Sequence, residues 1–126
     1  MSVEPNSKRV LIVDQSAESR EVLRTLLERT GTATLEATGP GEGATLAESS
    51  RPNLIVYDAD SDHTPGGEGS RQLADTATRM ATPIVLLGRI QGAKTSLLAN
   101  DHLAKPYHYG QLLRKIADVL DEHRAA

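Results

Sequence analysis

The sequence predicts an α/β protein with a doubly wound, five-stranded parallel sheet between two layers of helices, a three-layer α/β/α arrangement. Continuous runs of four apolar residues occupy 10–13, 54–57 and 84–87, as expected for strands buried on both faces of a parallel sheet. Apolar residues recur at helical spacing between these runs, and strands that alternate with helices favour right-handed βαβ crossovers. The length of 126 residues suits one domain.

The first βα unit has the clearest local signals. Residues 1–8 are polar, so we expect a disordered tail before a domain spanning 9–124. The first strand, 10–13, ends at Asp14, and Ser16 is suited to cap the helix that follows. Gly31 stands where a glycine commonly follows the last turn of a helix. The apolar face of that helix is expected to comprise Val22, Leu23, Leu26 and Leu27.

The middle of the chain repeats the strand and helix pattern. A short strand is expected at 33–37, followed by a weak helix over 41–50 that contains two glycines. The strand at 54–57 leads into Asp58. After a glycine-rich stretch, the spacing predicts a helix over 70–80.

The last third supplies two strands and two helices. The strand at 84–87 ends at Gly88, a short helix is expected at 94–99, and a short strand at 102–105. The final helix, 110–123, is amphipathic. Its apolar face comprises Leu112, Leu113, Ile116, Val119 and Leu120.

Composition excludes several classes of protein. The chain has no Cys, Phe or Trp, so the core must be largely aliphatic, and disulfides, thiolate metal sites and a cysteine nucleophile are excluded. The net charge is −3 without a basic stripe, which argues against a nucleic-acid partner. No apolar run approaches the ~18 residues of a membrane span, and no signal peptide is recognisable. We therefore expect a cytoplasmic protein with no membrane partner.

Charged residues follow the strands at the edge where ligands bind in open parallel sheets. Asp14, Asp58 and Lys105 each come at or just after the end of a predicted strand. One such residue is most often simply solvated, but three at one edge indicate a site. Two neighbouring carboxylates repel each other, so a cation is expected there, most naturally Mg²⁺ with its preference for oxygen ligands.

Four motifs in order resemble the receiver domains of two-component response regulators. They are VLIVD at 10–14, PNLIVYD at 52–58, TPIVLL at 82–87 and AKPY at 104–107. The resemblance implies a flavodoxin-like fold and a role in phosphorelay signalling, as a signalling domain rather than an enzyme. It also implies a histidine kinase or phosphotransfer protein as one partner and an output protein, as yet unknown, as another.

The same resemblance assigns roles to particular residues. Asp58 matches the aspartate that accepts the phosphoryl group, and Lys105 matches the lysine that pairs with the phosphoryl oxygens. The side chains of Asp14 and Asp58 and the backbone carbonyl of Asp60 match the ligands of a bound Mg²⁺. An acyl phosphate needs both a metal and an ammonium group to balance its charge.

Three substitutions and one deletion depart from the family pattern. Gln15 replaces the second acid of the metal site, Gly88 replaces a Thr or Ser hydroxyl, and His102 replaces a switch aromatic. The loss of the acid at Gln15 implies weak Mg²⁺ binding, and the 17-residue step from Gly88 to Lys105 implies a shortened fourth helix. This pattern indicates a degenerate receiver.

Three functions remain open at this point. The domain either accepts a phosphoryl group on Asp58 or acts as a pseudo-receiver through protein contacts alone, and the lost acid and hydroxyl slightly favour the second. A third interpretation is a haloacid-dehalogenase-like phosphatase, with Asp58 as nucleophile and Asp60 as acid–base group. That motif normally ends the first strand of a longer chain, which counts against it.

Overall fold

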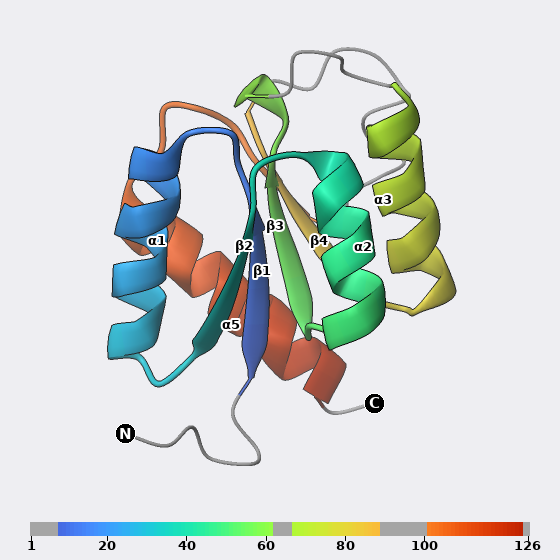
Figure 1. The fold of residues 1–126 in the computed structure, drawn as a ribbon. Coiled ribbons are helices and arrows are strands. Elements are labelled where there is room, and N and C mark those ends of the chain that lie inside the picture. The colour runs from blue at the N-terminus through green and yellow to red at the C-terminus, as the bar shows by residue number, and fades with distance from the viewer. Residues whose placement is uncertain (1–7, 62–66, 89–100, 125–126) are drawn as a thin grey trace.

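The computed structural model describes residues 8–61, 67–88 and 101–124, and these confirm the predicted sheet. The described strands form one parallel sheet in the order β2-β1-β3-β4-β5 (Figure 1). They comprise β1 (Arg9–Val13), β2 (Ala33–Ala37), β3 (Leu54–Asp58), β4 (Ile84–Leu87) and β5 (Asp101–Leu103).

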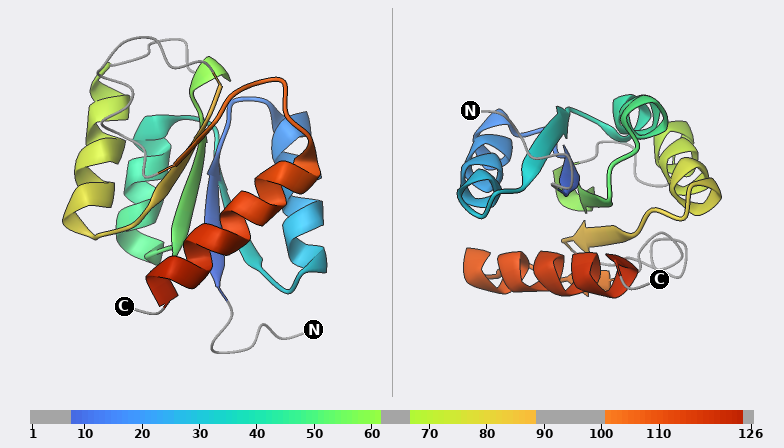
Figure 2. Two further views of the ribbon diagram at one scale, coloured as in Figure 1. Left: turned by 180° about the vertical axis from the view of Figure 1, so that it is seen from behind. Right: turned by 90° about the horizontal axis from the view of Figure 1, so that it is seen from below.

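Helices cover both faces of the sheet, as the doubly wound prediction requires (Figure 2). One layer holds α1 (Ala17–Arg29) and α5 (Tyr109–Arg124). The other holds α2 (Pro40–Ser50) and α3 (Glu68–Arg79), while a short 3-10 turn, η1 (Ala59–Ser61), follows β3. In the part of the chain that the structure describes, no helix has the length and apolarity needed to cross a membrane.

Two expectations fall largely outside the described residues. The tail expected at 1–8 is described only at Lys8, so the domain limits of 9 and 124 stay a prediction. The helix expected at 94–99, and with it the shortened fourth helix, also lies in an undescribed range.

The core forms two aliphatic clusters because alternate strand residues point to opposite faces. In β1, Val10 and Ile12 pack towards α1 and α5, whereas Leu11 and Val13 pack towards α2 and α3. Tyr57 belongs to the second cluster, and its hydroxyl shares a hydrogen bond of 2.9 Å with the buried Ser70 hydroxyl of α3. The central strands are therefore buried on both faces, as their sequence predicts.

The local signals hold with two corrections. The Ser16 hydroxyl accepts a hydrogen bond from the Ser19 N–H at the start of α1, and Gly31 follows the helix with a φ of +82°. The prediction that Val22 belongs to the buried face of α1 is wrong, because the helix turns that side chain towards solvent. The last strand ends at Leu103 and not at residue 105, since the Leu103 carbonyl accepts the Gly88 N–H and the chain then leaves the sheet.

Helix α2 lies so close to the sheet that one of its glycines has no room for a side chain. A Cβ on Gly43 would lie 2.8 Å from Cγ2 of Val13, which is fully buried and stiff about its first torsion. By contrast, a Cβ on Gly41 would make an ordinary contact of 3.9 Å with the Gln72 amide oxygen.

Alanine at either glycine raises helix propensity, but only at Gly43 does it also crowd the sheet, so the two variants distinguish the two effects. We expect Gly43→Ala to lower the free energy of unfolding by about 1–3 kcal/mol, because overpacking outweighs the gain in helix propensity. The control Gly41→Ala should leave stability unchanged or raise it by up to about 1 kcal/mol. Urea unfolding followed by circular dichroism measures both values. Equal stabilities for the two variants would contradict the packing argument.

Candidate functional site

Two buried carboxylates lie at the carboxyl edge of the sheet. Asp14 directly follows β1 and is 6% exposed, and Asp58 is the last residue of β3 and is 5% exposed. The strands β1 and β3 are direct neighbours, so the two aspartates leave the sheet side by side. Both line one small depression, together with Tyr107 and Tyr109.

The Asp58 carboxylate has a donor for each oxygen. The Lys105 ammonium donates a hydrogen bond of 2.7 Å to Oδ2, and the Asp60 backbone N–H donates one of 3.0 Å to Oδ1. Burial alone would lower the pKa of Lys105, but its hydrogen bond with Asp58 and the charges of Asp58, Asp60 and Asp14 raise that pKa overall. Lys105 is therefore a fixed cation beside the buried carboxylate.

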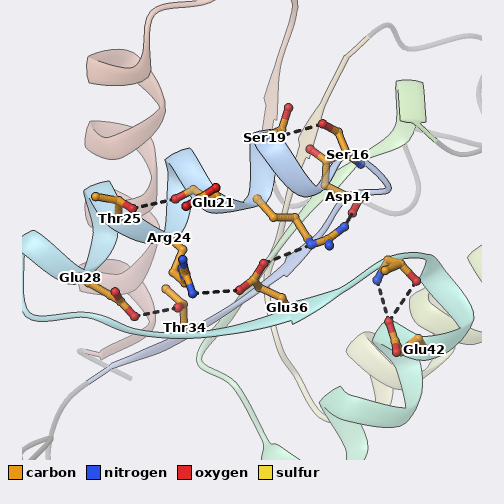
Figure 3. A network of polar contacts seen from close by, with 12 residues as sticks. Asp14, Ser16, Ser19, Glu21, Arg24, Thr25, Glu28, Thr34, Glu36 and Glu42 are labelled. Atoms are coloured by element: carbon orange, nitrogen blue, oxygen red, sulfur yellow. Dashed lines mark hydrogen bonds and ion pairs between the residues drawn. The ribbon is translucent and has the colours of Figure 1, made fainter.

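The Asp14 position is held from two sides (Figure 3). The Asp14 Oδ1 atom accepts a hydrogen bond of 2.8 Å from the Ser16 N–H, which shapes the turn into α1. The Arg20 guanidinium donates a hydrogen bond of 2.6 Å to the Asp14 backbone oxygen. Glu36 of β2 in turn pairs with Arg20 at 3.1 Å and with Arg24 at 3.8 Å. These contacts fix the loop that presents the Asp14 carboxylate.

Gly88 and His102, which stand where the family has a hydroxyl and an aromatic ring, contact each other directly. Gly88 has a φ of +108°, a conformation that residues with a side chain rarely adopt. Its carbonyl oxygen lies 2.6 Å from Nε2 of His102. Because a carbonyl can only accept, Nε2 carries the proton in this contact. A Cβ on Gly88 would lie 2.6 Å from the carboxyl carbon of Asp60, so the Asp60 side chain occupies that space.

An aromatic pair borders the site after Lys105. The rings of Tyr107 and Tyr109 meet edge to face at a centroid distance of 6.0 Å. Burial, and then the neighbouring Tyr109, Asp58 and Asp14, raise the pKa of Tyr107 to about 12. The neutral phenol is therefore the form that the folded site favours.

The structure brings together the core of the site predicted from sequence. Asp14, Asp58 and Lys105 share one edge of the sheet, while Gln15 is exposed beside Asp14. For a receiver, the sequence predicted a role only for the Asp60 backbone carbonyl, and its carboxyl group entered only as the acid–base group of the phosphatase alternative. The contacts of the Asp60 side chain with Gly88 and Lys105 were not predicted. The one sequence feature that could have indicated this contact is Gly88, a glycine at a position where the family has a hydroxyl.

The chemistry of the donor set fits Mg²⁺. In the described ranges, no three His, Cys, Asp or Glu side chains gather as a metal site. The two buried carboxylates, Asp14 and Asp58, nevertheless match the way proteins hold Mg²⁺, through one or two carboxylates with water and phosphate completing the shell.

Comparison with known proteins identifies the family. The family model described as response regulator receiver domain matches residues 10–117. The chain therefore belongs to the response regulator receiver family, whose members generally serve as signalling domains. Asp58 also ends the third strand in chain order and not the first, so these findings favour a receiver over the haloacid-dehalogenase-like alternative.

Individual relatives agree with this assignment. The chain is 31% identical over 123 residues to Protein PilH of Pseudomonas aeruginosa, covering 89% of this chain and 97% of PilH. It is 30% identical over 121 residues to the KDP operon transcriptional regulatory protein KdpE of Escherichia coli, covering 92% of this chain and 52% of KdpE. A receiver domain protein (CheY-like) from Methanospirillum hungatei JF-1 has a similar structure, with a TM-score of 0.81, 26% identity and coverage of 95% and 98%.

The raised pKa of Tyr107 makes stability depend on pH in alkaline solution. The unfolded chain releases this phenolic proton near pH 10, whereas the folded protein holds it up to about pH 12. Unfolding therefore releases a proton in this window, and the free energy of unfolding falls as pH rises through it. Between pH 8 and 11.5, the free energy of unfolding of Tyr107→Phe, measured by urea unfolding, should fall less steeply with pH than that of wild type. Parallel curves for the two proteins would contradict the assigned pKa.

Proposed function

We propose that this receiver domain accepts a phosphoryl group on Asp58 from a histidine kinase or phosphotransfer protein. The observation that carries the proposal is the hydrogen bond of 2.7 Å between Lys105 Nζ and Oδ2 of the buried Asp58. A degenerate domain that had only to present a surface would not need a buried carboxylate with a fixed ammonium beside it.

The transfer is a substitution at phosphorus. An Asp58 carboxylate oxygen forms a bond to the phosphorus of a phosphohistidine, the phosphorus–nitrogen bond breaks, and the electron pair returns to the imidazole of the donor. Negative charge spreads over the phosphoryl oxygens during transfer, and Lys105 is placed to balance part of it.

Mg²⁺ is proposed as the second source of positive charge. The Asp14 and Asp58 carboxylates and the Asp60 backbone carbonyl would hold it, and the metal would supply charge neutralisation. Gln15 offers at best a neutral oxygen at the family position of a second acid, so the proposed binding is weak.

The proposed output is contact with a partner protein. The chain spans nearly all of PilH but about half of the transcriptional regulatory protein KdpE. Gly88 has no side chain to contact the phosphoryl group, and the ring of His102 is held on the Gly88 carbonyl. We therefore infer that the domain signals with little change at β4 and β5. A cytoplasmic location is a separate part of the proposal, carried over from the sequence.

Phosphorylation is tested by intact mass after incubation with acetyl phosphate and Mg²⁺. Wild type should gain the mass of one phosphoryl group, and Asp58→Asn should gain none because it lacks the accepting oxygen. The control Asp75→Asn removes an exposed aspartate of α3 and should gain as much as wild type. If wild type gains no mass, the domain is a pseudo-receiver that works without phosphorylation.

The Gln15 assignment is tested by restoring the acid. Gln15→Asp should tighten Mg²⁺ binding on the order of tenfold, because an added carboxylate strengthens binding of a hard cation. Titration of backbone amide shifts by NMR measures the affinity. The control Asn53→Asp adds the same charge at the opposite edge of the sheet, beside the Arg9 N–H, and should change affinity little. Equal affinities for wild type and Gln15→Asp would place Gln15 outside the metal site.

A further inference from the structure

The Asp60 carboxylate occupies a space that a side chain on residue 88 would otherwise fill. A Cβ built on Gly88 would lie 2.6 Å from the Asp60 carboxyl carbon and from its Oδ1, and 2.8 Å from its Oδ2. At these separations a side chain on residue 88 would force the Asp60 carboxylate to move. The glycine and the inserted carboxylate are therefore two parts of one arrangement.

The same carboxylate also shares the cation of the site. Oδ2 of Asp60 lies 3.8 Å from Lys105 Nζ, which also donates to Asp58 at 2.7 Å. The Lys105 ammonium thus contacts two carboxylates, Asp58 at the end of β3 and Asp60 in η1. The share of charge balance that Lys105 can give to any further anion on Asp58 therefore comes from an ammonium that Asp60 already engages.

We propose that Asp60 acts as an internal competing anion that weakens the hold of the site on a phosphoryl group. Its negative charge lies beside Lys105, near where the phosphoryl oxygens on Asp58 would gather around that ammonium. Like charges this close repel, and the repulsion is greatest in the phosphorylated state. This inference rests on the proposed phosphorylation of Asp58 and makes Asp60 a positioning residue for that reaction.

The size of the effect follows from exposure. The Asp60 and Lys105 side chains are each 37% exposed, so water and salt screen their interaction. Exposed ion pairs of this kind contribute only a small interaction free energy. A change of about threefold to fivefold in affinity for a phosphoryl mimic is the expected range.

The experiment measures beryllofluoride binding in the presence of saturating Mg²⁺, which removes any contribution from altered metal affinity. Fluorine NMR reports the bound mimic directly. Asp60→Asn keeps the shape and the backbone carbonyl but removes the charge, and it should bind beryllofluoride about threefold to fivefold more tightly than wild type. Because the effect is electrostatic, the ratio should shrink when sodium chloride is raised from 0.05 to 0.5 M.

Two further variants isolate the charge. Glu48→Gln removes one carboxylate at the far end of α2, where Glu48 pairs with Arg79 at 3.1 Å, and should bind as wild type does. Asp60→Ala removes both the charge and the bulk and should behave as Asp60→Asn does. If Asp60→Ala alone binds more tightly, bulk and not charge is responsible, and the proposal is overturned.

The outcomes also separate this inference from the proposed function. Equal or weaker binding by Asp60→Asn, with clear binding by wild type, overturns the role of Asp60 and leaves phosphorylation of Asp58 standing. Binding by neither wild type nor Asp60→Asn overturns the proposed phosphorylation, and the role of Asp60 falls with it.

Discussion

The ion pair between Asp58 and Lys105 is the contact on which the arrangement of the site depends. A carboxylate as buried as Asp58 would cost several kcal/mol if it faced no cation, so the loop after β5 has to close over the sheet edge. That closure brings in Tyr107 and Tyr109, which border the depression shared with Asp14. One interaction between residues 47 positions apart therefore joins the centre of the sheet to the start of α5.

The parallel sheet explains why the acids meet at all. Its central strands alternate between two aliphatic clusters and leave no room for charge along their length. Charged side chains are accommodated only where the strands end, and parallel strands end at the same edge. Asp14 and Asp58 are consequently close neighbours because β1 and β3 are adjacent in the sheet, although 43 residues separate the two aspartates in the chain.

Sequence reasoning succeeded where a pattern is local. Runs of apolar residues located β1, β3 and β4, and the Ser16 cap and Gly31 marked the ends of α1. It failed where a residue distant in sequence determines the burial of a side chain, the end of a strand or a contact. Val22 fits the helical period of α1, but its side chain lies outside the face of the helix that packs on the sheet. Strand β5 ends where its pairing with β4 ends. The contact of the Asp60 side chain with Gly88 was not predicted for the same reason, because it depends on the register that sets Asp58 opposite Leu87.

The register of β4 and β5 relates two of the departures from the family pattern, Gly88 and His102, to each other. Taken singly, Gly88 and His102 are losses of a hydroxyl and of an aromatic ring. In the structure, the glycine adopts a φ of +108°, its carbonyl holds the His102 ring, and its bare Cα leaves room for the Asp60 carboxylate. A side chain at residue 88 would strain the backbone conformation and would displace the Asp60 carboxylate from its position. The three residues therefore form one rearranged contact beside Lys105, and changing any one of them alters the surroundings of the other two.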